Sequence, residues 1–364
     1  MSSPQPGARA PRLSVVIPSY NSAQWLPSTL SALADAVRDA DVATEVIVVD
    51  DGSTDDTPAA VTQAAASFPG DLRVMTQPNR GRFLARWAGI QAAAADLVLL
   101  LDSRVLVHRG ALRHVLAGVA AEPSRTAWNA VVVTDPAAPL VGLFWEVPTH
   151  VFWGRYLRSP RVLDLTGDNF DEAPKGTTMF LARKDVLIDA FEFAWPDGDT
   201  KLVSDDTKVL RRIAQLEGIR LDPGFSATYR PRTTLRGFLA HTLDRGTLFV
   251  DSYAGTTLAR SVILIALALA PILLIALVVV LFVVGSPAIA WAICIAVVAL
   301  ALLPAVIAAF NRCRGRAILA FVVGLPLFVF PFWLGLVRGI FIHRESFVRS
   351  RQSTGAIAPR TERR

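Results

Sequence analysis

The sequence predicts an α/β domain built on a parallel sheet, followed by an all-α region in a membrane. Over residues 13–101, short runs rich in valine, isoleucine and leucine alternate with helix-like segments, and this alternation is typical of strands joined by crossover helices. Polar residues follow each predicted strand. Between residues 261 and 337 lie three apolar segments without charge, each long enough for a membrane-spanning helix.

The elements of the first region follow one another in a regular order. The strands are predicted at residues 13–17, 44–50, 72–77 and 96–101, and the helices at 24–40, 55–68 and 81–95. In open sheets of this kind, ligands bind outside the carboxyl ends of the strands. Three of these ends read PSYN at 18–21, DDGSTDDT at 50–57 and DSR at 102–104. A turn or a helix cap explains each end alone, but together they indicate a binding site.

The apolar segments explain why the chain, with 52% hydrophobic and 19% charged residues, is too apolar for an ordinary soluble protein. Residues 261–284, 287–310 and 317–337 each suffice, at about 1.5 Å per residue, to cross roughly 30 Å of hydrocarbon. These lengths disfavour buried helices of a soluble core. Pro326 and Pro331 interrupt the third segment; we favour a full crossing, with a re-entrant or interfacial element as the alternative.

The charges predict which parts face the cytosol. The net charge is +6, and arginines cluster in the link at 311–316 and in the tail beyond residue 337, as expected of segments that face anionic lipid on the cytosolic side. Three full crossings would instead leave the tail outside, so the two expectations conflict. The amino terminus has no apolar stretch of a secretory signal. Cys294 and Cys313 indicate neither a disulfide framework nor a metal cluster.

We therefore expect a multi-pass protein of the cell (plasma or inner) membrane whose first 250 residues are cytosolic. The expected parts are a disordered N-terminus at 1–12, a cytosolic domain at 13–233, an interfacial amphipathic helix region at 234–257, a membrane region at 258–343 and a basic disordered tail at 344–364. No basic face interleaved with aromatic residues occurs in the soluble part, so a nucleic-acid partner is not expected. The oligomeric state is left open.

Four segments resemble the inverting nucleotide-sugar glycosyltransferases of family 2. They read VVIPSYN, VIVVDDGSTDDT, NRGRFLARWAGI and LLLDS, and together they cover about residues 13–105. The resemblance implies the GT-A fold, a Rossmann-like domain for nucleotide-diphospho-sugars. It also implies a donor site at the strand ends, lined by Pro18, Tyr20, Asn21, Asp50, Asp51, Arg86, Asp102 and Arg104.

The resemblance further implies a divalent cation. Asp102 matches the first acid of the family's Asp-x-Asp, which holds Mg²⁺ or Mn²⁺ on the donor pyrophosphate, a role that suits oxygen ligands. Arg104 stands where the second acid usually lies. Either Asp102 holds the cation with phosphate and water, or Arg104 supplies positive charge to the departing diphosphate, or Arg104 turns to solvent. We expect weaker metal dependence than in an Asp-x-Asp enzyme.

The acceptor side is predicted further along the chain. The segment KGTTMFLARKDVL at 175–187 resembles the family's acceptor-side strand, which makes Thr177 and Thr178 candidate acceptor contacts. In SDDTKVLRRIA at 204–214, Ser204 or Asp205 is a plausible helix cap. By position Asp206 matches the family's general base, which takes the proton of the acceptor hydroxyl, and Asp205 is the second choice.

The segment at 238–253 has apolar residues at helical spacing and is predicted to be an interfacial amphipathic helix. Polysaccharide synthases of the family carry Gln-x-x-Arg-Trp here. This chain keeps only Arg245, which is a candidate for the acceptor or the diphosphate, with snorkelling toward lipid headgroups as its alternative. The missing Gln and Trp put processive polymerisation in doubt.

The predicted function is that of a membrane-anchored inverting glycosyltransferase in cell-envelope polysaccharide biosynthesis. It would move a sugar from a nucleotide-diphosphate donor to a lipid-linked or cell-envelope glycan acceptor at the cytosolic face. A processive synthase is disfavoured by the missing motif and by three helices, few for an export channel. A polyprenyl-phosphate sugar synthase lacks its Asp-x-Asp-Leu-Gln-His signature here. A degenerate domain acting as a scaffold or nucleotide-sugar sensor is the non-enzymatic alternative.

Overall fold

The computed structural model describes residues 10–195, 201 and 206–349. The chain divides into two compact units. The first comprises Met1–Thr233 with Ala305–Phe321, and the second comprises Thr234–Pro304 with Val322–Arg364. The segment 305–321 is therefore part of the unit that contains the sheet, although it includes the end of one apolar segment and the start of the next. Each unit is described by itself below.

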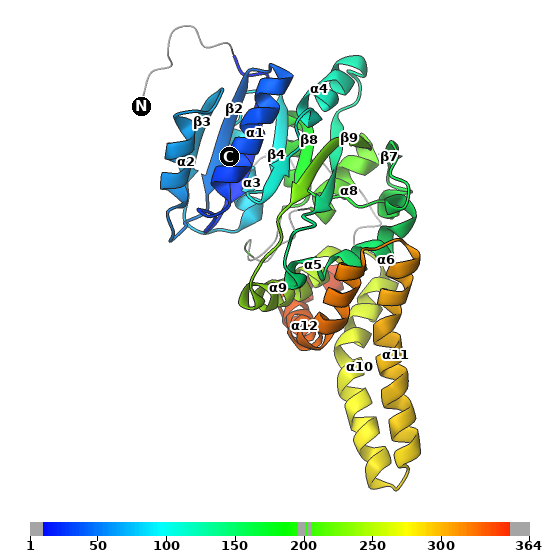
Figure 1. The fold of residues 1–364 in the computed structure, drawn as a ribbon. Coiled ribbons are helices and arrows are strands. Elements are labelled where there is room, and N and C mark those ends of the chain that lie inside the picture. Colours follow the sequence, from blue (N-terminus) through cyan, green and yellow to red (C-terminus); the bar gives the residue numbers. More distant parts are fainter. Residues whose placement is uncertain (1–9, 196–200, 202–205, 350–364) are drawn as a thin grey trace. The chain divides into compact units, whose positions relative to one another are not determined.

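A nine-stranded mixed sheet forms the first unit, in the order β3-β2-β1-β4-β8-β6-β9-β5 with β7 paired to β9 (Figure 1). Its parallel half consists of β1 (Leu13–Ser19), β2 (Thr44–Asp50), β3 (Asp71–Thr76) and β4 (Leu97–Leu101), joined by α1 (Leu26–Ala40), α2 (Thr57–Ala65) and α3 (Arg82–Ala92). The predicted alternation of strands and helices is confirmed. The runs become strands because buried β-branched residues satisfy their backbone groups in a ladder.

The other half of the sheet is mainly antiparallel and was not predicted in detail. Its strands are β5 (Val105–Val107), β6 (Ala127–Thr134), β7 (Leu163–Leu165), β8 (Met179–Arg183) and β9 (Ile219–Tyr229). Its helices are α4 (Ala111–Ala121), α5 (Leu140–Leu143), α6 (Glu146–Leu157), the 3₁₀ turn Phe170–Glu172, α7 (Lys184–Phe193) and α8 (Thr207–Leu216). Because β8 runs antiparallel to β4, it begins where β4 ends.

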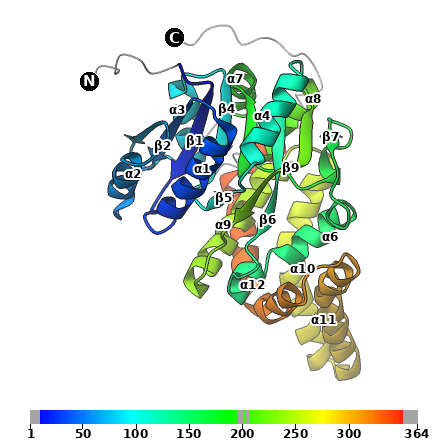
Figure 2. The ribbon, with the colours of Figure 1, turned by 45° about the horizontal axis from the view of Figure 1, so that its top comes forward.

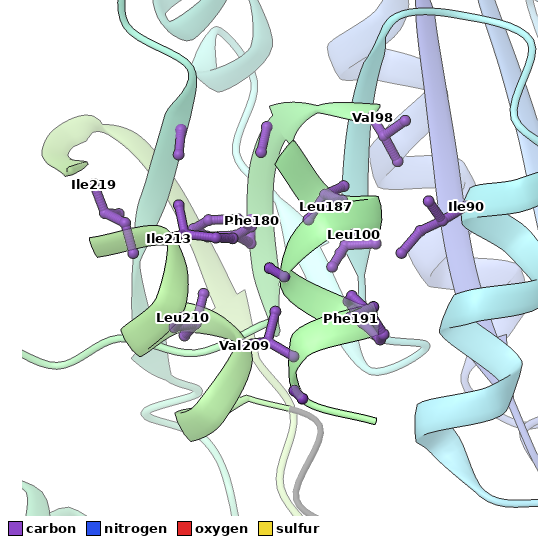
Figure 3. Close-up of a cluster of buried hydrophobic side chains, with 14 of the residues drawn as sticks. Ile90, Val98, Leu100, Phe180, Leu187, Phe191, Val209, Leu210, Ile213 and Ile219 are labelled. Atoms are coloured by element: carbon purple, nitrogen blue, oxygen red, sulfur yellow. The ribbon is translucent and has the colours of Figure 1, made fainter. Parts of the chain in front are cut away.

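Two apolar cores cover the two faces of the sheet. Along β1, Val15 and Ile17 join the core under α1 and α4, whereas Val16 points to the core under α3, α7 and α8. Figure 3 shows the second core, in which Phe180 of β8 lies among side chains of α7 and α8. Gly89 permits a close approach here, because a Cβ would meet Val16 Cγ1 at 2.3 Å. The helices thereby fix the strand ends that carry the polar residues.

The second unit is helical. It contains α9 (Leu235–Tyr253), α10 (Leu258–Val283), most of α11 (Pro287–Phe310), most of α12 (Gly315–Ile342) and α13 (Arg344–Arg349). By length and composition α10, α11 and α12 are each able to cross a membrane, which confirms the three predicted apolar helices. Pro326 and Pro331 lie inside α12 without ending it.

Candidate active site

One asparagine ties together the carboxyl ends of β1 and β2. Asn21 has a left-handed backbone with φ 47°, which asparagine tolerates better than most residues. Its Oδ1 accepts hydrogen bonds from the N–H and Oγ1 of Thr54 at 2.8 and 3.3 Å, and its own N–H donates to Ser53 Oγ at 2.9 Å. Asn21 therefore shapes the loop after β2. Pro18 is buried inside β1, and Tyr20 is half exposed.

Asp51 anchors the loop that leads into α3. One carboxylate oxygen accepts from Gln77 Nε2 at 2.7 Å and from the Arg80 N–H at 2.8 Å, and the other accepts from the Gly81 N–H at 2.8 Å. These bonds compensate the burial of the charge. Asp50 accepts one bond at 3.1 Å from the backbone three residues on. Both acids expected at the nucleotide thus also hold the loops around β2.

The centre of the site is an ion pair between Arg86 of α3 and Asp102 after β4. Nη2 of Arg86 lies 2.5 Å from Asp102 Oδ1 and 3.4 Å from the backbone oxygen of Thr177. The Arg86 side chain is 1% exposed and that of Asp102 is 21% exposed, so the carboxylate is the member that a ligand can reach. Burial lowers the pKa of Arg86 to about 10, against the opposing charges of Asp102 and Asp206. The guanidinium is charged at neutral pH.

The start of β8 closes one side of this ion pair. Leu101 faces Met179 across the antiparallel ladder, and the N–H of Asp102 donates to the backbone oxygen of Thr178 at 2.9 Å. Thr177 is buried. Both threonines proposed for the acceptor therefore meet the Arg86–Asp102 pair through their backbone oxygens.

The Arg104 side chain lies against an aromatic ring. Its guanidinium carbon is 4.7 Å from the centre of the Trp25 ring, a distance typical of a cation–π contact. Arg230 lies 5.2 Å from the same ring and donates to the Trp25 backbone oxygen at 2.9 Å and to Thr29 Oγ1 at 2.6 Å. Within the described part of the chain, Arg104 Nη1 is buried without a hydrogen-bond partner. The sequence did not indicate that the Arg104 side chain stacks on Trp25.

The residues around Asp102 fit a weakly held cation. In the described ranges, no group of three His, Cys, Asp or Glu residues is arranged to hold a metal. Asp102 offers a single carboxylate, and one of its oxygens already accepts from Arg86. Mg²⁺ is commonly bound through one or two carboxylates together with substrate phosphates and water. This donor set is compatible with a cation that the diphosphate of a substrate holds in large part.

Asp206 is the N-cap of α8. Its Oδ1 accepts from the N–H of Thr207 at 2.5 Å and from Thr207 Oγ1 at 3.0 Å, which satisfies a free donor of the first helical turn. Its charge acts on Arg86, so the first candidate base lies near the ion pair. The second candidate base, Asp205, lies outside the described residues, as does Ser204.

Sequence reasoning missed a charged cluster beside Asp206. Lys175 Nζ lies 3.8 Å from Asp171 Oδ1 and 4.1 Å from the centre of the Phe170 ring. Arg211 Nη2 lies 3.6 Å from the same carboxylate oxygen, and its guanidinium is 4.4 Å from the same ring. Burial lowers the pKa of Lys175 to about 8; Asp171 and Asp206 raise it, and Arg211 lowers it further. These cations and the candidate base form one electrostatic group.

The sequence contained only a weak signal for this cluster. Lys175 directly precedes the glycine and threonines of the acceptor-side segment, but its partner Arg211 lies on α8, 36 positions further along. Arg245 belongs to α9 in the second unit, where its Nε lies 3.3 Å from His241 Nε2.

Comparison with known proteins gives three findings. Residues 14–190 match the model of Glycosyl transferase family 2. An undecaprenyl-phosphate 4-deoxy-4-formamido-L-arabinose transferase from Sodalis glossinidius is 40% identical over 94 residues, which are 25% of this chain and 28% of that protein. An enzyme of the same name from Pseudomonas aeruginosa is 35% identical over 129 residues, 32% of this chain and 38% of that protein. The matches thus span well under half of these relatives.

The third finding is a solved structure with the same fold. A mannosyltransferase from Pyrobaculum calidifontis, in complex with GDP-Man and Mn²⁺, superposes with a TM-score of 0.54 over 88% of both chains at 20% identity. At this identity the likeness shows the fold alone. It confirms the predicted GT-A-like domain followed by a helical region.

Proposed function

Because residues 14–190 match the model of Glycosyl transferase family 2, we propose that the protein transfers a sugar from a nucleotide-diphosphate donor to a lipid-linked acceptor at the cytosolic face of the cell membrane. The observation that carries this proposal is the Arg86–Asp102 pair with Asp206 in electrostatic reach. It combines a buried cation, an accessible carboxylate and a candidate base at the carboxyl ends of the strands. The apolar helices support an acceptor held in the bilayer.

On the donor side, Asp102 is proposed to hold the diphosphate through a divalent cation, and the buried Arg86 behind it to act on the diphosphate through its charge. The reaction breaks the bond between the anomeric carbon and the diphosphate oxygen, and the nucleoside diphosphate departs with that electron pair. Positive charge near the departing oxygens stabilises them, and the buried guanidinium of Arg86 supplies it without reorganisation. A bound Mg²⁺ or Mn²⁺ would add Lewis-acid charge there, with Asp102 as its protein ligand.

On the acceptor side, Lys175 and Arg211 favour a phosphate-bearing lipid. Two cations beside one candidate base are suited to an acceptor that is itself an anion, and the relatives from Sodalis and Pseudomonas are named as undecaprenyl-phosphate transferases. We therefore favour a polyprenyl phosphate as acceptor. Its phosphate oxygen attacks the anomeric carbon from the face opposite the leaving group, which inverts the configuration.

The acceptor class determines what Asp206 has to do. A hydroxyl acceptor carries a proton that a base must remove in the transition state. A phosphate monoester has its second pKa near 6, so at neutral pH most of it attacks without losing a proton. Asp206 then accepts a proton only from the fraction of the acceptor phosphate that is still singly protonated. For the rest, Asp206 orients the neighbouring cations, Lys175 and Arg211. The same residue therefore gives different pH profiles for the two acceptors.

The test uses the full-length protein in detergent or membranes with a panel of labelled nucleotide sugars and undecaprenyl phosphate. Label is expected in the organic extract. The Asp206→Asn variant is expected to lose about tenfold at pH 7.5 and more below pH 6. A loss of about 10²–10⁴-fold at every pH would indicate a hydroxyl acceptor instead. Asp168→Asn, which changes an exposed carboxylate of the same unit, is the control.

Two results would overturn the proposal. No transfer from any nucleotide sugar, in wild type or variant, would favour the scaffold or sensor. Label found only in long polymer would favour a processive synthase. Thin-layer separation of the lipid extract from the polymer fraction distinguishes these results in one experiment.

A further inference from the structure

The link between α11 and α12 is held on the first unit by specific contacts. Asn311 Nδ2 donates to the backbone oxygen of His150 at 2.8 Å, and Arg314 Nε lies 3.1 Å from Glu146 Oε2. Arg316 donates to the backbone oxygen of Pro136 at 3.0 Å. The Glu146 side chain is buried, which strengthens its pairing with Arg314. The amino-terminal end of α12 therefore lies on the membrane side that holds the first unit.

The carboxyl-terminal half of α12 packs closely on α9. Thr247 Oγ1 lies 3.0 Å from the backbone oxygen of Gly335. A Cβ at Gly335 would meet the Leu243 backbone oxygen at 2.0 Å, and one at Gly246 would meet the Phe332 oxygen at 2.3 Å. Such contacts require small residues on both helices. Since α9 precedes the first apolar helix in the chain, it lies on the same membrane side as the first unit.

The same half of α12 contacts the first half of α10. Trp333 Nε1 donates to the backbone oxygen of Ala268 at 2.9 Å, and Leu336 joins Leu264 and Ala268 in one apolar cluster. At 1.5 Å per residue, Ala268 is about 15 Å from the start of α10, whereas Trp333 is about 27 Å along α12. An α12 that crossed alongside α10 from the same depth would bring Trp333 level with about residue 276 of α10 instead.

We infer that α12 lies along the membrane surface on the side of the first unit, so that the chain crosses the bilayer twice, through α10 and α11. The amino-terminal end of α12 contacts the first unit, and its carboxyl-terminal half contacts α9. Both contacts are on one side of the membrane, whereas the two ends of a crossing helix lie on opposite sides. Within the second unit, Figure 1 shows α12 nearly end-on while α10 is seen along its length, and Figure 2 shows α12 from another direction. The proposal rests on the contacts of the link and of α12 and is independent of the proposed enzyme activity.

The surface that meets the lipid is a stripe along α12. Six of its exposed apolar side chains recur at helical spacing and are Leu319, Val323, Leu327, Phe330, Leu334 and Phe341, while Val322, Val329 and Ile342 are exposed outside this stripe. Buried residues such as Ala317 and Leu336 lie on the other side of the helix. A helix with one protein-covered face and one apolar face suits the boundary between headgroups and acyl chains. Two crossings also return the arginine-rich tail to the side of the first unit, which removes its conflict with the charge rule.

The first experiment is cysteine labelling from one side of the membrane. In full-length protein with Cys294→Ala and Cys313→Ala, single cysteines are introduced as Ser159→Cys in the first unit, Ser286→Cys between α10 and α11, Gly315→Cys in the link and Ser353→Cys in the tail. Sealed vesicles are treated with a membrane-impermeant maleimide before and after permeabilisation. Positions 159, 315 and 353 are expected to label from one side and 286 from the other. A tail that labels together with 286 would overturn the inference.

The second experiment measures the depth of the α12 stripe. Nitroxide labels at positions 319, 323, 327, 330 and 334 of the same cysteine-free protein are exposed to oxygen and to a nickel chelate in vesicles. A surface helix is expected to show shallow and nearly constant depth at all five positions. A maximum in depth at 327–330 would indicate a crossing and overturn the inference. Positions 269 and 276 on α10 serve as controls for a crossing helix.

Discussion

The two halves of the sheet hold their polar groups in different ways. In the parallel half, Asp51 and Asn21 are fixed by backbone N–H groups of neighbouring loops. In the antiparallel half, Lys175 and Arg211 are held by a carboxylate and by the face of Phe170. Directional backbone bonds fix the polar groups of the parallel half, which is proposed for the donor, whereas those of the antiparallel half, proposed for the acceptor, depend on a balance of charge. The donor half should therefore respond to lost hydrogen bonds and the acceptor half to pH.

The largest effect is expected where the two halves meet, at Arg86. Arg86→Met removes the buried partner of Asp102 and the positive charge that it places behind the proposed diphosphate site. We expect a loss of about 3 kcal/mol in the free energy of unfolding and at least a hundredfold loss in kcat/KM. Thermal unfolding measures the loss of stability, and a sugar-transfer assay measures the loss in kcat/KM. Arg109→Met, at an arginine whose side chain is 83% exposed, is the control. A variant with wild-type activity would show that the pair is structural only.

A smaller effect is expected at Asp51 in the donor half. Asp51→Asn replaces an acceptor of three hydrogen bonds by an amide whose NH₂ group faces other donors, and leaving buried donors without a partner costs about 2 kcal/mol. Asp50→Asn, where one bond is affected, should cost about half as much. Denaturant unfolding of the two variants checks the order. Equal losses would mean that the Asp51 bonds do not hold the loop.

In the acceptor half, Lys175 predicts a pH dependence. Its pKa falls from 10.5 in the unfolded chain to about 8 in the folded protein, so between these values the unfolded chain binds more protons and stability rises with pH. Below pH 8 Lys175 is charged in the folded protein, so the cost of burying its charge lowers the free energy of unfolding in full. Lys175→Met should therefore be more stable than wild type by about 2 kcal/mol at pH 7, with the difference vanishing near pH 10.5. Thermal unfolding across pH 6–10.5 measures it.

The same titration should appear in acceptor binding. As Lys175 loses its charge above pH 8, the KM for a phosphate acceptor should rise, while Lys175→Arg should keep it level to higher pH. Lys201→Met, at an exposed lysine of the first unit, should leave the profile unchanged. A KM that is flat in wild type across pH 7–9.5 would mean that Lys175 does not contact the acceptor.

The same contrast explains how much of the molecule was predictable. The parallel half follows from local patterns: buried runs such as 44–50 read as strands, and the loop acids stand directly after them. The antiparallel half depends on pairings between distant segments, such as β6 with β9, and on Lys175 meeting Arg211, which no local pattern specifies. The three apolar helices followed from composition alone. The direction of α12 did not, because it depends on small residues at its contact with α9.

The smallest effect is expected at Arg104, where the sequence posed its sharpest question. Arg104→Ala removes a stack on Trp25 that is partly exposed and worth about 0.5–1 kcal/mol. Arg104→Asp restores the Asp-x-Asp pattern in sequence, but the side chain at this position lies against Trp25, so the new carboxylate should not tighten cation binding. The Mn²⁺ concentration for half-maximal activity should therefore agree within a fewfold between the two variants. Markedly tighter Mn²⁺ binding by Arg104→Asp would show that position 104 reaches the diphosphate, and would place the native guanidinium in the chemistry after all.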